Sequence, residues 1–328
     1  MIQKKEIKIF IEGKDMSDQI GIISAVHDTY AGDYVDTLTA SLQDKDGTWS
    51  KWRPKTGEKI ELNFSTAKTG VMFIHKITSM NGVYEIVARS IPPFKNSVQK
   101  REWKNASFSM ICQTIASDLG LTLETYGTPD PTYEQVHQLG EKNTAFLSRI
   151  CHCEGCDMLA FNEKLVVYDK VQMESQQSKF SYDFTGKGDF TFSRNDGLKV
   201  GKVIVARYKK ENDWGRPETS TTEHDWDWNE RILYQGEASS GEGRTIVYKD
   251  LLPTSDVECT RWAGNLLKKA NEKLSTGKFT LNLTPELAAG SVITIQNSRA
   301  TEWNGNVFLY HVRHDYQSTY TTLYFRKI

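Results

Sequence analysis

The chain has no excess of charge of either sign and no long apolar run. Its 328 residues include 41 Lys and Arg against 42 Asp and Glu, which gives a formal net charge of −1. This balance argues against recognition of nucleic acid or an anionic membrane through a general electrostatic field. No segment reaches the roughly 18 consecutive apolar residues of a membrane-spanning helix. We therefore predict no direct nucleic-acid or membrane binding.

Cysteine is scarce as well. The five cysteines are odd in number and lack the spacing of a secreted disulfide framework, which favours folding in a reducing compartment. The first residues, MIQKKEIKIFIEGKD, place charges where a secretory signal needs an apolar core. We therefore expect them to form a first strand.

The common signatures of enzymes are missing. The sequence has no nucleophile elbow, no HExxH motif and no GxGxxG-bearing βαβ unit. In GEASSGEGRT, Gly236 and Gly241 have the spacing of a phosphate-binding loop. The next two residues are Glu242 and Gly243, where such a loop needs Lys and a hydroxyl residue. We predict that the chain is not an enzyme and needs no cofactor.

What the chain does contain is the same β-rich pattern twice, once near each end. Around Gly57 it reads TGEKIELNF, GVMFIHKITSM and GVYEIVARS, and around Gly290 it reads AGSVITIQN, GNVFLYHVRHD and TYTTLYFRKI. Each copy has a turn glycine, an alternating strand, a strand centred on Phe73 or Phe308, and an aromatic strand that closes on Arg. The runs TLTASLQD and KFTLNLTPEL precede the two copies. The repeat predicts two related β-domains, with both phenylalanines in their cores.

Changes in hydrophobic period divide the rest of the chain. Residues 1–93 alternate with period two and predict a first tube-like β-barrel. Residues 94–180 predict a small α/β domain. Residues 181–235 plus 277–328 predict a second β-barrel, which a helix-containing insertion at 236–276 interrupts. The expected fold class is therefore mixed and β-rich, with two related β-barrels, an intervening α/β domain and a helical insertion.

Two predicted helices have clear terminal signals. Ser107 can cap the first, and Gly120 can end it in a left-handed conformation. Ser255 and Glu258 have the spacing of a capping box at the start of the inserted helix.

A cysteine cluster is the first candidate site. Cys151, Cys153 and Cys156 lie close together, with His137 upstream, and thiolates and imidazoles are the usual ligands of zinc. Two of these cysteines fall in or at the end of a predicted helix, where they point to different sides. Two interpretations stay open, a structural metal site and buried thiols that bind nothing, and we predict no metal.

A second candidate is the polar loop that carries His224, Trp226 and Trp228. An imidazole beside Asp225 and Asp227 could serve acid/base chemistry, but no matched nucleophile follows. Aromatic and acidic loops often form contact surfaces. We predict a protein-contact role for His224, Trp226 and Trp228, with a solvated loop as the alternative.

The middle of the chain resembles a known family. The run WKNASFSMICQTIASDLGL, followed by YEQVHQLGEKNTAFLSRICHCEG, is similar to the signature segment of the phage late control D proteins, which are relatives of the VgrG proteins and of contractile-tail baseplate hubs. The matching positions are Trp103, Ala116 to Leu121, Tyr133, Gln135 and Phe146 to Arg149. The tail around TPELAAGSVITI and TYTTLYFRK also resembles the last barrel of this family.

This resemblance implies a structural baseplate hub of a contractile tail, from a phage or a tail-derived particle such as an R-type bacteriocin. A homotrimer would join the sixfold tail tube to the threefold central spike, because two β-barrels per chain supply six units. The implied partners are a tail tube or tube-initiator protein, a central spike protein, other baseplate proteins and a tape-measure protein. Assembly would take place in the bacterial cytoplasm. Since the sequence ends at Ile328 after the second barrel, we expect the spike to be a separate protein.

Two other functions remain as alternatives. A tail-associated cell-wall hydrolase would need paired carboxylates or a metal triad on one scaffold, and no separate segment is left to hold them. A carbohydrate-binding β-module would use exposed Trp side chains.

Overall fold

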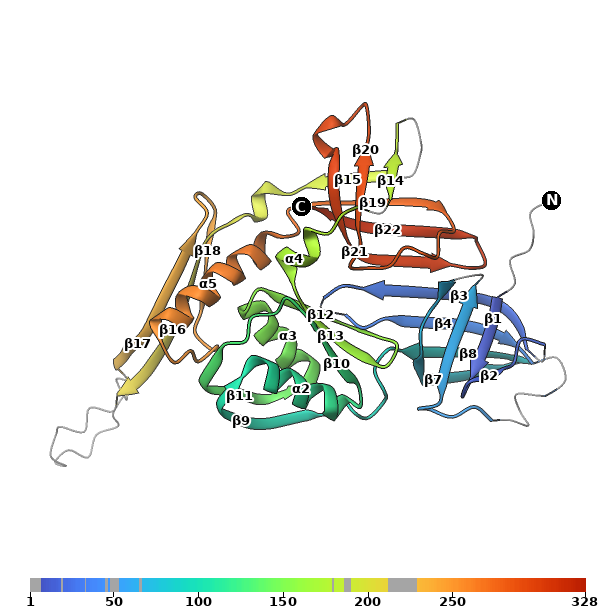
Figure 1. Ribbon diagram of the computed structural model, residues 1–328, viewed down its shortest axis with the longest axis horizontal. Helices are drawn as coiled ribbons and strands as arrows, with labels where there is room; N and C mark the ends of the chain where they lie inside the picture. Colours follow the sequence, from blue (N-terminus) through green and yellow to red (C-terminus); the bar gives the residue numbers. More distant parts are fainter. Residues whose placement is uncertain are drawn as a thin grey trace, which may run out of the picture.

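The architecture is that of a β-rich protein with few helices (Figure 1). The structure, a computed structural model, describes residues 7–18, 20–32, 34–44, 47, 53–64, 67–178, 180–185, 190–211 and 229–328. The two β-domains lie one above the other, the middle domain lies below, and a sheet with one long helix stands at the far side. The predicted mixed, β-rich fold class is confirmed.

The first β-domain is built from strands that bury every second residue. β4 (Thr37–Gln43) buries Leu38, Ala40 and Leu42, as its alternation predicts. The other strands are β1 (Ile7–Ile11), β2 (Lys14–Asp15), β3 (Gly21–Tyr30), β5 (Lys59–Phe64), β6 (Ala67–Lys68), β7 (Met72–Met80) and β8 (Val83–Arg89).

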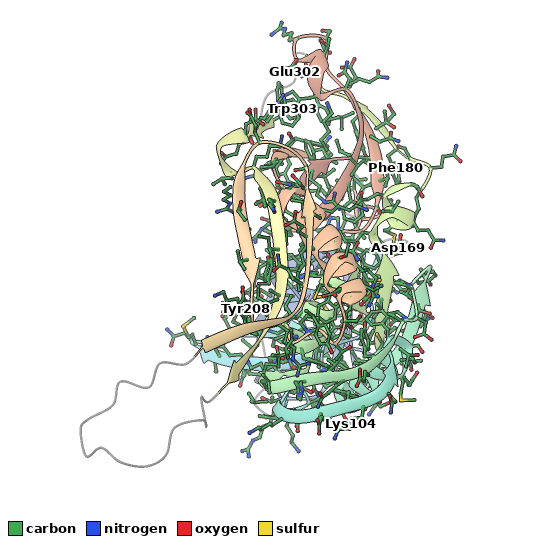
Figure 2. The ribbon with its side chains drawn as sticks, turned by 90° about the vertical axis from the view of Figure 1, so that its left-hand side faces the viewer. Lys104, Asp169, Phe180, Tyr208, Glu302 and Trp303 are labelled. Atoms are coloured by element: carbon green, nitrogen blue, oxygen red, sulfur yellow. The ribbon has the colours of Figure 1, made fainter. Side chains whose placement is uncertain are left out.

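The second β-domain has a core of its own, in which Phe279, Leu309 and Phe325 are buried. A short turn, η2 (Thr301–Trp303), carries Trp303, which lies near the tip of this domain in Figure 2. The strands are β14 (Ser181–Asp183), β15 (Phe190–Arg194), β19 (Ser275–Asn282), β20 (Val292–Gln296), β21 (Gly305–Asp315) and β22 (Tyr320–Lys327).

The two β-domains share one 14-stranded sheet. They meet where β21 pairs antiparallel with β3, so the sheet runs β15-β19-β22-β21-β3-β4-β8-β7-β5-β1-β2, with β6, β14 and β20 at its sides. Within the described residues no sheet closes into a ring. The sequence predicted two barrels, but the two β-domains are halves of one open sheet. Each half covers a hydrophobic core of its own. Alternation predicts which face of a strand is buried, but it does not predict whether the first and last strands meet.

The middle domain combines short sheets with helices. Ser107 caps α2 (Phe108–Leu119) by accepting a hydrogen bond from the Met110 N–H at 3.2 Å, and Gly120 ends it at φ 73°, as predicted. The remaining elements are β9 (Val98–Ser107), β10 (Thr122–Tyr126), β11 (Thr132–Lys142), α3 (Asn143–Cys153), β12 (Cys156–Phe161), β13 (Lys164–Asp169) and α4 (Lys170–Glu174).

A three-stranded sheet and one long helix form a further unit. The sheet contains β16 (Val200–Glu211), β17 (Asn229–Ser239) and β18 (Arg244–Tyr248), and it follows the turn η1 (Asp196–Leu198). Figure 2 shows its strands alongside the helix, with Tyr208 labelled. The predicted domain limits stay a prediction, but strand pairing places residues 200–211 and 229–239 in this sheet, whereas the predicted limits assign residues up to 235 to the second β-domain.

The helix α5 (Asp256–Asn271) packs closely on this sheet. A Cβ added to Gly236 of β17 would lie 2.2 Å from the Thr260 N of the helix, so only glycine allows this approach. Ser255 caps the helix by accepting from the Glu258 N–H at 3.2 Å. The Glu258 carboxylate accepts from the Thr254 N–H at 2.6 Å, so the predicted capping box is shifted by one residue on that side.

Candidate functional site: the joint between the two repeats

The two copies of the repeat have the same strand order. In the first copy β4 pairs with β8, β8 with β7 and β7 with β5. In the second copy β19 pairs with β22, β22 with β21 and β21 with β20. All six pairings are antiparallel. The repeat seen in the sequence is therefore a repeat of topology.

The turn that begins each copy makes the same hydrogen bond. The Gly57 N–H donates to the Ile74 O at 2.8 Å, and the Gly290 N–H donates to the Leu309 O at 2.8 Å. Both glycines have left-handed backbones, with φ of 96° and 88°. A residue with a side chain is strained in that conformation, which explains why glycine stands at both positions.

The copies also share an irregularity and a buried ring. A register shift falls between Ile74 and Lys76 in β7, and between Leu309 and His311 in β21. Phe73 and Phe308 each precede that shift by one residue and are 6% and 3% exposed. Because a β-bulge inserts one residue and bends its strand, a bulge at matching positions gives both copies the same local bend.

The joint between the copies is an ion-paired strand contact. Arg313 of β21 stands opposite Asp28 of β3, and its Nη1 lies 3.2 Å from Asp28 Oδ2. His311 Nε2 lies 2.8 Å from Asp28 Oδ1, and the His311 ring stacks on Tyr30 with centroids 4.4 Å apart. Asp28 is 8% exposed, so its charge is compensated in a largely dry setting. These contacts fix the register of the two β-domains.

A neutral layer lies beside this ion pair. His27 and His314 are opposite each other in the register, and burial lowers the pKa of His27 to about 3 and that of His314 to about 4. Burial also raises the pKa of Asp36 to about 8, although its carboxylate accepts the Tyr30 N–H at 2.8 Å. These groups border a cavity of about 450 Å³. The shifted pKa values favour the uncharged forms of His27, His314 and Asp36 at neutral pH, in contrast to the ion pair of Asp28 with Arg313.

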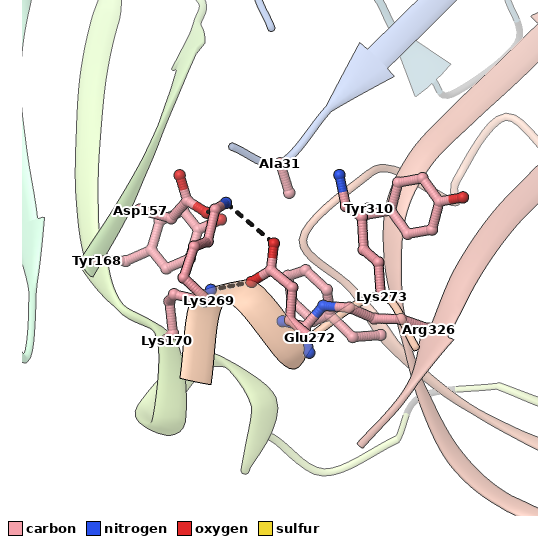
Figure 3. Close-up of a pocket in the computed structure, with 10 residues that line it drawn as sticks. Ala31, Asp157, Tyr168, Lys170, Lys269, Glu272, Lys273, Tyr310 and Arg326 are labelled. Carbon is pink, nitrogen blue, oxygen red and sulfur yellow. Dashed lines mark hydrogen bonds and ion pairs between the residues drawn. The ribbon is translucent and has the colours of Figure 1, made fainter. Parts of the chain in front are cut away.

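A second charged cluster ties α5 to the middle domain. Lys269 of α5 lies 3.3 Å from Asp157 Oδ2 of β12 and 3.0 Å from Glu272 Oε1. Lys170 of α4 also pairs with Glu272. Burial alone would raise the pKa of Glu272, but the ammonium groups of Lys170 and Lys269 hold it below its usual value. Figure 3 shows these side chains facing one another, with Arg326 of β22 beside them.

Glu154 is a buried group with several hydrogen-bond donors around it. The residue is 4% exposed, and its carboxylate accepts hydrogen bonds from the Tyr133 hydroxyl at 3.0 Å, Arg261 Nε at 2.9 Å and Trp262 Nε1 at 2.8 Å. A carboxylate held by three donors is poorly placed to abstract a proton from a substrate. We interpret it as a structural link between α3 and α5.

The candidate cysteines are buried in the middle domain. Cys151 and Cys153 lie in α3, Cys156 begins β12, and each is 0% exposed. Burial raises the pKa of all three thiols, which favours the protonated form that binds metal poorly. In the part of the chain that the structure describes, no group of three or more His, Cys, Asp or Glu could hold a metal ion.

The other predicted contact residues, His224, Trp226 and Trp228, lie outside the described residues. The Asp28 cluster was missed because its residues are far apart in sequence and the second copy has no acidic counterpart. The one usable signal was the repeat, since two similar domains in one chain need a joint.

Among the described helices, none is long and apolar enough to cross a membrane.

Comparisons with known proteins identify the fold. No family model and no curated protein matches the sequence. A 43 kDa tail protein of prophage MuSo2 from Shewanella oneidensis has a TM-score of 0.70 at 9% identity, with 98% of each chain covered. A tail protein from Neisseria meningitidis has a TM-score of 0.70 at 12% identity and covers 98% of this chain and 96% of its own.

A third solved structure is more distant. It is an Escherichia coli component of the type VI secretion system, with a TM-score of 0.59 at 12% identity, and the match covers 97% of this chain and 76% of that one. Identities this low establish the fold alone. Over nearly its whole length, the chain therefore has the fold of phage tail proteins.

Proposed function

We propose that the chain is the structural baseplate hub of a contractile tail, and that it joins a sixfold tail tube to a threefold central spike as a homotrimer. One observation carries this proposal: the two copies share strand order, turn hydrogen bond and bulge position, and they are joined in tandem by β21 and β3. The folds of the Shewanella and Neisseria tail proteins support a tail role.

The physical argument concerns symmetry. A threefold assembly can meet a sixfold ring without strain only if each subunit offers two equivalent units. The turn hydrogen bonds at Gly57 and Gly290 have the same length and the backbones at both glycines are left-handed, so the two units can present similar backbone surfaces. A chain with one β-domain would leave half of the tube subunits without a matching contact.

The proposal names partners and a setting. The tube side would contact a tail tube or tube-initiator protein, and the other side a central spike protein. Other baseplate proteins and a tape-measure protein are further partners. The particle would be a phage or a tail-derived particle such as an R-type bacteriocin, of the late control D and VgrG-like kind, with assembly in the bacterial cytoplasm.

The proposed role is architectural and not enzymatic. The buried carboxylates of Glu154, Asp157 and Glu272 are each paired with cations, which suits a rigid body that transmits force. We also propose that His224, Trp226 and Trp228 form a protein contact. Trp226→Ala with Trp228→Ala should then impair assembly while the fold survives.

Mass measurement and mixing test the hub. We expect purified chain to have the mass of three copies, to bind a tail tube protein from the same gene cluster, and to give no clearing on a peptidoglycan zymogram. A chain that stays a monomer and binds neither a tube nor a spike protein would contradict the hub. Clearing on the zymogram would support the hydrolase alternative instead.

A further inference from the structure

We propose that copies of this chain join through two free strand edges, residues 76–80 of β7 and residues 190–194 of β15, in the register that β21 and β3 use within the chain. This inference rests on the proposed homotrimer and adds which strands make its interface. Its occupant is a second copy of the same chain.

The equivalence follows from the repeat. The bulge makes β7 the counterpart of β21, because the register shift after Ile74 corresponds to that after Leu309. The counterpart of β3 is β15, because β3 pairs antiparallel with β4 and β15 pairs antiparallel with β19, the strand that corresponds to β4. The strand pair β21 and β3 therefore has β7 and β15 as its equivalents.

Both of these edges lack a partner within the described residues. β15 pairs only with β19 there. β7 pairs with β8 along most of its length, but it pairs with β5 only at Met72 and Phe73. Lys76 to Met80 thus present an unpaired backbone edge. An exposed edge is a template for another strand, so proteins usually cover it or pair it.

The backbone groups of β15 point in the required direction. The Tyr316 N–H donates to the Ala25 O, and the Ala31 N–H donates to the Tyr310 O. The backbone N–H and C=O groups of every second residue from Ala25 to Ala31 therefore point toward β21. In the second copy the Asn195 N–H donates to the Leu274 O at 2.8 Å, so Asn195 faces β19.

Alternation in an antiparallel sheet then turns Phe190, Phe192 and Arg194 outward. Matching the two copies through β4 and β19 makes Phe192 the counterpart of His27, whose backbone groups face β21. The residues of β15 whose backbone groups point away from β19 are therefore the counterparts of the β3 residues that bond to β21. If the two copies were out of register by one residue, the backbone groups of Thr191 and Ser193 would point outward instead.

The transferred register defines the side chains that meet. Thr78 takes the place of Arg313, and Ser193 takes the place of Asp28, so these two stand opposite each other between copies. Met80 would face Thr191, and Lys76 would face Asn195. No like charges are opposed, and hydroxyl pairs stabilise antiparallel strands. At its central position, the joint between copies thus has two neutral hydroxyl groups where the joint within the chain has an ion pair.

Such a contact links different surfaces of the two copies. Contacts of this kind generate a closed ring when the rotation per unit closes, and an open filament when it does not. With two units per chain joined by alternating internal and external joints, three chains close a ring of six. The ring would leave no free edge at either strand.

Disulfide trapping tests the register. Chains carrying Thr78→Cys and chains carrying Ser193→Cys, with different tags, are mixed and oxidised. Residues directly opposite in a non-hydrogen-bonded pair have the short separation that a disulfide needs. We expect a covalent dimer that contains both tags. The described native cysteines are all buried, which keeps background cross-linking low.

A register-shifted pair is the control. Ser79→Cys mixed with Ser193→Cys places the thiols on opposite faces of the sheet, so we expect at least tenfold less cross-linked dimer. Equal yields from the two mixtures would overturn the register. A trimer by mass with no cross-link in either mixture would overturn the edge proposal and leave the hub standing. A monomer by mass would overturn both.

A second pair of variants does not depend on oxidation. Thr78→Arg with Ser193→Asp transplants the internal ion pair to the joint between copies, and should slow dissociation of the trimer in a salt-dependent way. Thr78→Arg with Ser193→Arg opposes like charges and should speed dissociation. If both double variants dissociate at the unmodified rate, these edges do not form the interface.

Discussion

The joint within the chain and the free edges proposed to join copies differ in charge although they match in geometry. Within the chain, Asp28 is held by Arg313 and His311. At the free edges the corresponding positions are Ser193 and Thr78. A permanent joint folds once and can hold a buried charge that needs its partners, whereas a joint between copies must tolerate solvent before it forms. Duplicated domains can therefore keep a backbone register while exchanging the side chains that secure it.

The largest expected effect comes from equivalent core residues of the two copies. Ile74 and Leu309 each accept the hydrogen bond of their turn glycine through the backbone oxygen, and each is 0% exposed. Replacing either by Ala should cost about 2–5 kcal/mol of unfolding free energy, because lost burial and a residual cavity add. Urea unfolding measures the cost. Ile23→Ala, at a side chain 42% exposed, is the control. A large difference between the two core variants would contradict equivalence of the copies.

The next prediction concerns Asp36, beside the joint within the chain, and how the unfolding free energy depends on pH. The pKa of Asp36 is about 8 in the folded protein, against an ordinary value of 3.8 for the unfolded chain, so between these values the folded state binds more protons. Stability from this group therefore falls as pH rises through that window. Asp36→Asn keeps an acceptor for the Tyr30 N–H, and its unfolding free energy relative to the unmodified chain should rise by about 3–4 kcal/mol from pH 5 to pH 8.

Unfolding of both proteins at those two pH values is the check. A gain that is the same at pH 5 and pH 8 would mean that the Asp36 carboxyl does not titrate as described. The two buried histidines are present in both proteins, so their own effect, a loss of stability as pH falls below 6.5, cancels in the comparison.

A smaller effect on stability distinguishes Asp28, at the joint within the chain, from Ser193, its counterpart at the free edge. Asp28→Ala should lower stability by about 1–2 kcal/mol, because His311 and Arg313 lose their shared partner and Arg313 stays half exposed to solvent. Ser193→Ala should change the stability of the single chain by less than about 0.5 kcal/mol. Thermal unfolding of both variants tests this. Equal losses would remove the distinction between a secured joint and an open edge.

The last effect, similar in size to that of Asp28→Ala, concerns the turns. Gly57→Ala and Gly290→Ala should each cost about 1–2 kcal/mol, since a left-handed backbone is strained for a residue with a Cβ. The added Cβ would lie 3.8 Å from Pro93 Cγ in one case and 3.8 Å from Leu159 Cδ2 in the other, so no clash is added. The two losses should agree within about 0.5 kcal/mol. Calorimetry of the two variants measures them.

The sequence predicted the local structure and the duplication well. Ser107, Gly120 and Ser255 end or begin helices where their chemistry requires. The glycine and phenylalanine of each copy marked the shared topology, because turn and core positions are fixed by backbone geometry that the sequence must satisfy.

The joint and the sheet boundaries could not be predicted in the same way. Pairing of β21 with β3 brings together residues 285 apart, such as Arg313 and Asp28, and no local pattern encodes it. Val203 and Val205 alternate as they would in any sheet, so nothing assigned them to the sheet under α5. Whether a sheet closes depends on its accumulated twist and its neighbours, which a period of two does not report.

The most direct test of the proposed hub is an image of the purified chain as an assembled particle. Electron microscopy with class averaging should give a ring of three copies in which six β-units of similar shape alternate, with threefold symmetry and pseudo-sixfold features. A ring with one β-unit per chain at the rim, or a particle in which the two β-domains of each chain occupy unrelated positions, would contradict the equivalence of the two copies and the hub that depends on it.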